Sequence, residues 1–213
     1  MFKMLLLATA VLVTAAPARP AGSIVGHVTF RQGPLQKTAN RYPTGSGGAA
    51  RVIEPIPAVA YLVGAFPGGD KAATTAKPRM AQRDTAFQPG LLIVPVGSTV
   101  DFPNQDHFFH NVFSYSKPKR FDLGRYPRGE TKSVRFDQPG GVSVFCEIHK
   151  WMRAGIVVVE NPYHAMVDAE GNFRIDGVPP GKYKLEVWHI ERGRRTVDIT
   201  VPEAGSARVN IAF

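Results

Sequence analysis

The stretch 142-VSVFCEIHKWMRAGIVVV-159 joins two apolar, largely β-branched runs through a short segment that carries the chain's only cysteine. Runs of this kind between turn residues predict β-strands. No long stretch has helical periodicity, and 18 Pro and 21 Gly interrupt the chain. The fold class is therefore predicted to be all-β, an antiparallel sandwich or barrel. The expected strands are 24–30, 91–96, 132–136, 142–146, 155–160, 182–189 and 196–201.

Residues 1–21 have the pattern of a secretory signal peptide. A short basic start is followed by the apolar run Met4–Val13 and by an A-x-A cleavage site at Ala16-Pro17-Ala18. That apolar run is about half of the roughly 20 residues that a membrane-spanning helix needs. We therefore expect a periplasmic protein whose mature chain has no membrane span.

The rest of the chain divides into three regions by composition. Residues 22–79 are expected to be an N-terminal β segment that contains a flexible loop at 40–57. Residues 80–160 are a dense β segment with all the promising chemistry, and residues 161–213 are a further β module. Within that module Asp168–Asn172 is expected to form a hairpin turn, with Gly171 free to take a positive φ.

The chain is basic, with a formal net charge of +9 at pH 7. Basic clusters occur at 117-KPKR-120 and 192-RGRR-195. Nucleic-acid binding would also need a recognition motif or interleaved aromatic residues, and neither is found. A solvated surface explains the charge best. A second interpretation is steering toward an acidic protein partner.

Cys146 needs an explanation in an exported chain. Cysteines in an oxidising compartment usually occur in pairs, and this one has no partner within the chain. His149 and Met152 follow it with the spacing C-x-x-H-x-x-M. A thiolate, two imidazoles and a weak thioether are the donors of a copper site for electron transfer. A tight loop after the strand that ends at Cys146 would bring three of these four donors to one centre.

The second imidazole has to come from elsewhere in the chain. His110, in 107-HFFHNVFS-114, is the best candidate, because 99-TVDFPNQD-106 predicts a strand that leads into this loop. Asn111 is expected to hydrogen-bond the ligand loops to each other. His107 lies close to His110 and stays an alternative ligand. The remaining histidines show no metal-binding pattern; they are His27, His164 and His189.

The segments 87–113 and 142–159 resemble the cupredoxins, the small blue-copper proteins that include plastocyanin and amicyanin. The resemblance covers about residues 80–160 and includes the F-x-P, V-G-S-T-V and H-N-V motifs and a short amicyanin-like C-x-x-H-x-x-M loop. It implies a Greek-key β-sandwich that carries single electrons. It also implies that one type 1 copper ion is bound by His110, Cys146, His149 and Met152. Asn111 would be the residue that braces the cysteine loop.

The flanking sequence is similar to a second kind of protein. The patterns 110-HNVFS-114, 121-FDLG-124 and 178-VPPGKY-183 resemble exported plastocyanin-like proteins, some of them called methylamine-utilisation proteins. Residues 167–189 resemble the carboxypeptidase regulatory-like, transthyretin-type β module, which is typically non-catalytic. Two arrangements stay open for the N-terminal segment. It is separate, or its strand 23–30 begins this same module and the cupredoxin unit is inserted.

Other chemistries fit these residues less well. A binuclear copper centre needs two cysteines, and structural zinc sites prefer four strong ligands. A cysteine hydrolase would leave Met152 without a role, and copper nitrite reduction would need a second, histidine-rich site. We therefore predict a non-enzymatic electron carrier between redox protein partners. The alternative is a copper-handling protein, or an adaptor that docks a larger redox enzyme. The few, unclustered methionines favour the carrier.

Overall fold

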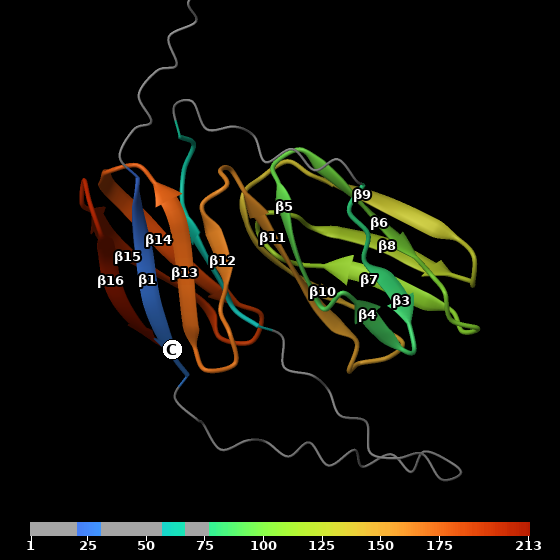
Figure 1. Ribbon diagram of the computed structural model, residues 1–213. Coiled ribbons are helices and arrows are strands. Elements are labelled where there is room, and N and C mark those ends of the chain that lie inside the picture. The colour runs from blue at the N-terminus through green and yellow to red at the C-terminus, as the bar shows by residue number, and fades with distance from the viewer. Residues whose placement is uncertain (1–20, 31–56, 67–76) are drawn as a thin grey trace, which may run out of the picture.

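The computed structural model describes residues 21–30, 57–66 and 77–213 (Figure 1). Every regular secondary-structure element in these ranges is a β-strand, which confirms the all-β prediction. Each strand expected from the sequence forms within a few residues of its predicted limits. The described ranges contain no helix that could cross a membrane. The expected signal peptide, except Ala21, and residues 40–56 of the predicted loop lie outside the described residues.

The middle of the chain forms a first β-sandwich. Its strands are β3 (Ala81–Arg83), β4 (Ala86–Gln88), β5 (Leu91–Pro95), β6 (Ser98–Pro103), β7 (His110–Ser114), β8 (Phe121–Tyr126), β9 (Thr131–Phe136), β10 (Gly140–Phe145) and β11 (Arg153–Val159). The larger sheet has the order β5-β11-β10-β7-β8, with β11 parallel to β5 and antiparallel to β10. The opposite layer consists of the strand pairs β3–β4 and β6–β9. Isolated β-bridges between Gln82 and Asn104 and between Arg79 and Asp101 connect the two pairs.

The core of the first sandwich follows from the alternation of side chains along its strands. Val142 and Val144 of β10 point into it, as do Ala154, Ile156 and Val158 of β11. Each apolar side chain that is fully removed from water stabilises the fold by about 1.5–3 kcal/mol. The largest buried side chains that complete this core are Met80, Phe87, Phe102, Tyr126, Phe136 and Met152.

The two ends of the chain together form a second β-sandwich. Its strands are β1 (Gly22–Thr29), β2 (Val59–Leu62), β12 (His164–Met166), β13 (Asn172–Val178), β14 (Gly181–His189), β15 (Gly193–Val201) and β16 (Ser206–Ala212). One sheet has the order β13-β1-β16 and the other the order β12-β2-β14-β15. Strand β1 runs antiparallel to β13 and parallel to β16. The chain therefore leaves this sandwich after β2 and returns to it at β12 (Figure 1).

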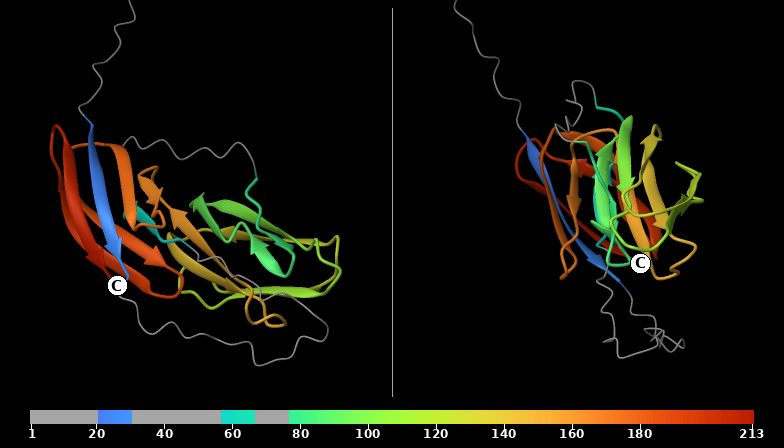
Figure 2. Two further views of the ribbon diagram at one scale, coloured as in Figure 1. Left: turned by 60° about the horizontal axis from the view of Figure 1, so that its bottom comes forward. Right: turned by 90° about the vertical axis from the view of Figure 1, so that its right-hand side faces the viewer.

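A third apolar core joins the two sandwiches. Strand β11 is buried on both faces: its even-numbered residues enter the first sandwich, while Val157 and Val159 point the other way. They pack against Val59, Tyr61 and Trp188 from β2 and β14. This double burial explains why β11 is an unbroken apolar run from Ala154 to Val159. The molecule has four β layers with the five- and four-stranded sheets innermost (Figure 2).

The turn predicted at Asp168–Asn172 forms, with Gly171 at φ +89°. The backbone N–H of Asn172 donates to the Asp168 carboxylate at 2.6 Å. The prediction of a hairpin is wrong, however, because β12 pairs with β2 whereas β13 pairs with β1 in the other sheet. The turn thus passes the chain between layers, and the sequence could not reveal this because the partner strands lie far away in the chain.

Candidate metal centre

The loop between β10 and β11 is closed by its own backbone. Phe145 and Arg153 are the last paired residues of the two strands. Beyond them the N–H of Cys146 donates to the carbonyl of Met152 at 3.3 Å, and the N–H of Met152 donates to the carbonyl of His149 at 2.8 Å. Cys146 and Met152 therefore continue the antiparallel geometry, and their side chains are buried in the same core.

His110 is brought to this loop by the neighbouring strand. It is the first residue of β7, which pairs with β10 through Phe113 and Phe145. The imidazole of His110 has no exposed surface. His110 lies 36 residues from Cys146 in the sequence, and the sheet order places β7 directly beside β10.

The donor atoms of three predicted ligands converge. The Nδ1 atoms of His110 and His149 are 3.1 Å apart, and the Cys146 Sγ lies 4.0 Å from His110 Nδ1. Ligand atoms of the three side chains all lie within 4.8 Å of one another. Bonds of about 2.0 Å to imidazole and about 2.3 Å to thiolate, the lengths known for zinc, allow donors bound to one ion to be up to about 4.3 Å apart. The His110–His149 and His110–Cys146 separations both meet this test, as ligands of one shared metal ion must.

The predicted brace Asn111 contacts the cysteine loop. Its side-chain oxygen accepts the backbone N–H of Glu147, the residue after Cys146, at 3.4 Å. Its amide nitrogen donates to the Asp122 carboxylate of β8 at 2.7 Å. Asn111 is almost fully buried. It thereby connects the strand that carries His110 with the loop that carries the thiol.

Asp106 is a residue of the site that the sequence reasoning missed. Its Oδ2 lies 2.8 Å from Nε2 of His110, on the far side of the ring from the donor atoms. Burial raises the pKa of the Asp106 carboxyl, but the hydrogen bonds that it accepts, that of the Thr85 backbone foremost, outweigh this effect and hold the pKa below its usual value. An acid four residues before a candidate histidine was the available signal.

The rim of the site is apolar and aromatic. Of the three converging side chains only His149 is partly exposed. Its ring makes edge contacts with Phe108 and Trp151, at centroid distances of 6.4 and 5.2 Å. Four large apolar side chains near it are exposed, namely Phe108, Phe109, Ile148 and Trp151. The partly exposed ligand candidate thus lies among surface aromatic groups.

The other histidines lie apart from this cluster. His107 is exposed, and its ring nitrogens are 2.8 and 3.0 Å from a guanidinium nitrogen of Arg128. His27, His164 and His189 belong to strands β1, β12 and β14 of the second sandwich.

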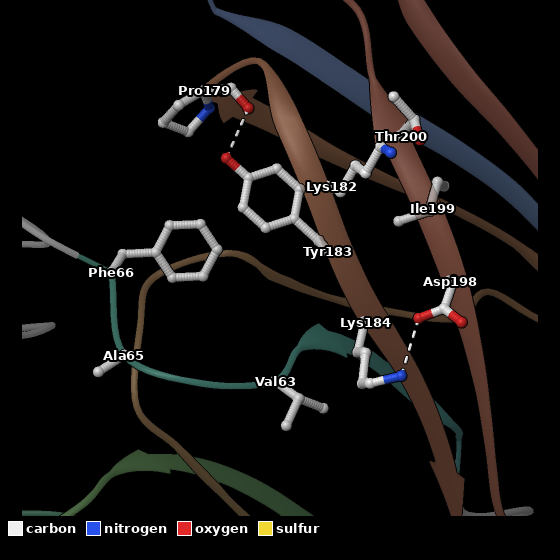
Figure 3. Close-up of a pocket in the computed structure, with 10 residues that line it drawn as sticks. All are labelled: Val63, Ala65, Phe66, Pro179, Lys182, Tyr183, Lys184, Asp198, Ile199 and Thr200. Carbon is white, nitrogen blue, oxygen red and sulfur yellow. Dashed lines mark hydrogen bonds and ion pairs between the residues drawn. The ribbon is translucent and has the colours of Figure 1, made fainter.

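The second sandwich carries a cavity of its own, with a volume of about 670 Å³ (Figure 3). Two pairs of its polar groups contact each other: Lys184 contacts Asp198 at 2.8 Å, and the Tyr183 hydroxyl donates to the carbonyl of Pro179 at 2.8 Å. Its lining residues are Val63, Ala65, Phe66, Pro179, Lys182, Tyr183, Lys184, Asp198, Ile199 and Thr200.

Two family models match the chain. The model for copper binding proteins of the plastocyanin/azurin family matches residues 74–160. The first sandwich therefore resembles a cupredoxin domain. Copper, the metal named in that family's description, suits a donor set of one thiolate and two imidazoles. The carboxypeptidase regulatory-like domain matches residues 153–213, so both models include β11, the strand that contributes to two cores.

Solved structures that are similar to the chain include a purple cupredoxin from Nitrosopumilus maritimus, with 22% identity over 38% of this chain and 99% of that one, at a TM-score of 0.36. A reduced Cu(I) form of an amicyanin variant has 20% identity to this chain, with a TM-score of 0.38. The match covers 47% of this chain and 98% of the amicyanin chain. A copper-containing nitrite reductase from Thermus scotoductus SA-01 has 23% identity to this chain, with a TM-score of 0.38. The match covers 63% of this chain but only 28% of the reductase chain. No curated protein matches the chain.

Proposed function

We propose that this chain is a periplasmic type 1 copper protein that carries single electrons between redox partners. The observation that supports this most strongly is the convergence of His110, Cys146 and His149 between β7 and the β10–β11 loop. The buried Met152, three residues after His149, is proposed as the weak axial ligand. Copper in such a set would cycle between its two oxidation states while the four side chains stay bound.

The frame around the donors supports a carrier better than a copper-handling protein. His110, Cys146 and Met152 are buried, and they lie at the ends of three adjacent strands of one sheet, β7, β10 and β11. A rigid, closed donor set suits a site that must change little when an electron moves. Delivery of copper to another protein would instead favour open and exposed donors. The role of an adaptor for a larger redox enzyme remains the second candidate for the module at residues 161–213.

His149 is proposed as the point at which electrons enter and leave. Its ring is partly exposed, and the apolar rim of Phe108 and Trp151 around it can be desolvated when a partner docks. The net charge of +9 favours acidic redox partners through electrostatic steering.

We also propose that the cupredoxin domain is inserted into the carboxypeptidase regulatory-like module. The pairing of β1 with β13 and β16, and of β2 with β12 and β14, supports this. The shared core at Val157 and Trp188 would keep the two parts in a fixed orientation.

Visible spectroscopy tests the proposed metal site. Cu(II) added to the purified protein should produce an intense thiolate-to-copper absorption band, which the Cys146→Ser variant lacks. Potentiometric titration should then show a reversible one-electron change. A wild-type protein that binds copper but stays colourless would contradict the electron-carrier proposal. Osmotic-shock fractionation and N-terminal sequencing of the released protein test the periplasmic location and the cleavage after the signal peptide.

A further inference from the structure

Asp106 uses its carboxylate to connect three separate parts of the cupredoxin domain. Its Oδ2 lies 2.8 Å from His110 Nε2 and accepts the Thr85 N–H at 2.8 Å. Its Oδ1 accepts the N–H of Asp84 at 2.7 Å. Its own N–H donates to the side-chain oxygen of Asn104 at 3.0 Å. The side chain of Asp106 is only 11% exposed, so these contacts are largely shielded from solvent.

This arrangement determines which nitrogen of His110 is free to bind a metal. An ionised carboxylate has no proton to donate, so Nε2 of His110 must carry the hydrogen in the 2.8 Å contact. The lone pair of the neutral ring then lies on Nδ1, the atom that faces Cys146 and His149. A metal-binding histidine is commonly fixed in this way by an acceptor on its second nitrogen, which also raises the basicity of the ring.

The turn that Asp106 holds is connected to the other ligand loop. Asp84 and Thr85 both have positive φ values, 54° and 50°, which is a rare conformation for a β-branched residue such as Thr85. Such a conformation persists where the surroundings fix it, and here both N–H groups point at one carboxylate. The carbonyl of Thr85 accepts the indole N–H of Trp151 at 3.2 Å, and the indole contacts the His149 ring.

We propose that Asp106 is a positioning residue that orients His110 and lowers the reduction potential of the copper site. This inference rests on the proposed copper function. The negative charge beside His110 favours Cu(II) over Cu(I), because the more highly charged ion gains more from a nearby anion. Through the Asp84–Thr85 turn the same carboxylate also supports the loop that carries His149 and Trp151.

The test compares Asp106→Asn with Asp137→Asn in the copper-loaded full chain. Asp137 is an exposed acid that pairs with Arg135 just after β9, at the end of that strand away from Asp106, so its loss removes the same charge from a distant place. In Asp106→Asn the visible band should remain, and the ratio of Cu(II) to Cu(I) affinity should fall about tenfold. A tenfold change corresponds to a rise of about 59 mV in the midpoint potential of a one-electron couple. Asp137→Asn should leave the potential unchanged.

Nitrogen-15 NMR of the imidazoles in the copper-free wild-type protein gives a readout that needs neither copper nor a folded variant. The neutral His110 ring should carry its proton on Nε2. A proton on Nδ1, or an unchanged potential in Asp106→Asn, would overturn the inference. If wild-type protein forms no coloured copper site, the proposed function fails, and the NMR result alone decides whether Asp106 orients His110.

Discussion

The indole of Trp188 lies directly over Gly141: a Cβ atom on this glycine would come within 2.1 Å of the indole Nε1. Trp188 belongs to β14 of the second sandwich and Gly141 to β10 of the first sandwich. A second glycine, Gly155 of the adjacent β11, leaves space for the other end of the same ring. Two glycines in neighbouring strands thus leave space for the Trp188 indole where the two sandwiches join.

Substitution of Gly141 by alanine should destabilise the protein through this contact. The new methyl group has to displace the indole, and overpacking of this kind typically costs about 1–3 kcal/mol in the free energy of unfolding. Chemical denaturation of wild type and Gly141→Ala measures the change. Trp188→Ala should cost about 3–5 kcal/mol because it leaves a cavity. In the double variant, Gly141→Ala should not lower the free energy of unfolding below that of Trp188→Ala alone. If the losses of the two single variants add up in full, the indole is not what Gly141 accommodates.

Tyr61→Phe should destabilise the joint between the sandwiches through a buried acid. The Tyr61 hydroxyl donates to the carboxylate of Glu186, which is itself buried. Burial, and then this hydrogen bond, raise the pKa of Tyr61, so the hydroxyl remains a donor at any physiological pH. Its removal leaves a buried carboxylate oxygen without this donor, at a cost of about 1–3 kcal/mol.

The matched control for this hydroxyl is Tyr183→Phe. The Tyr183 hydroxyl donates to a backbone carbonyl, that of Pro179, at a partly buried position where water can replace it. Thermal unfolding should therefore show a smaller loss in Tyr183→Phe than in Tyr61→Phe. Equal losses in the two variants would argue against a special role of Glu186.

Asn111→Ala should weaken copper binding without abolishing the colour. The substitution removes the acceptor for the Glu147 N–H and the donor to Asp122, so the cysteine loop loses its link to β7. Loss of such a supporting residue typically reduces metal affinity by about tenfold or more. Competition with a copper chelator measures the affinity. Asn210→Ala, an exposed change in β16, is the control; the same affinity in both variants would contradict the bracing role.

His107→Ala and His110→Ala should have opposite outcomes in the visible spectrum. His110 is fully buried beside the Cys146 thiol, whereas His107 is exposed and contacts Arg128. The copper-loaded His107 variant should therefore keep its absorption band, and the His110 variant should lose it. Loss of the band in His107→Ala alone would reverse the ligand assignment.

Asp101 should contribute stability that disappears on acidification. Hydrogen bonds from Lys77 and then from Ser133 hold the pKa of its carboxyl below the usual 3.8. A carboxyl whose pKa is lowered by folding stabilises the native state above its unfolded pKa, and this contribution is lost as the pH falls through the folded pKa. Wild type should be more stable than Asp101→Asn at neutral pH, and the difference should shrink below pH 3.8. A difference independent of pH would rule out an electrostatic origin.

The ligand candidates were accessible from the sequence because three of them lie in one loop. The spacing of Cys146, His149 and Met152 depends only on a strand that ends at the cysteine and a short return to the next strand. Local alternation and turn residues also determined the all-β class. His110 followed from its own motif, and the structure brings it to Cys146 because β7 lies beside β10.

Other features depended on contacts between residues far apart in the chain. Asp106 gains its place at the site only because the Asp84–Thr85 turn and His110 meet at its carboxylate. The apolar run of β11 predicted a buried strand, but nothing local indicates that its two faces enter different cores.

What the sequence alone determined is the chemistry of the cysteine loop and the strand-forming pattern, because both arise between near neighbours. What only the tertiary structure decided is which strands pair and what lies behind each ligand. The pairing of β1 with β16 joins residues from opposite ends of the chain. Its stability comes from a core that exists only once both ends have folded together, so no local stretch can encode it.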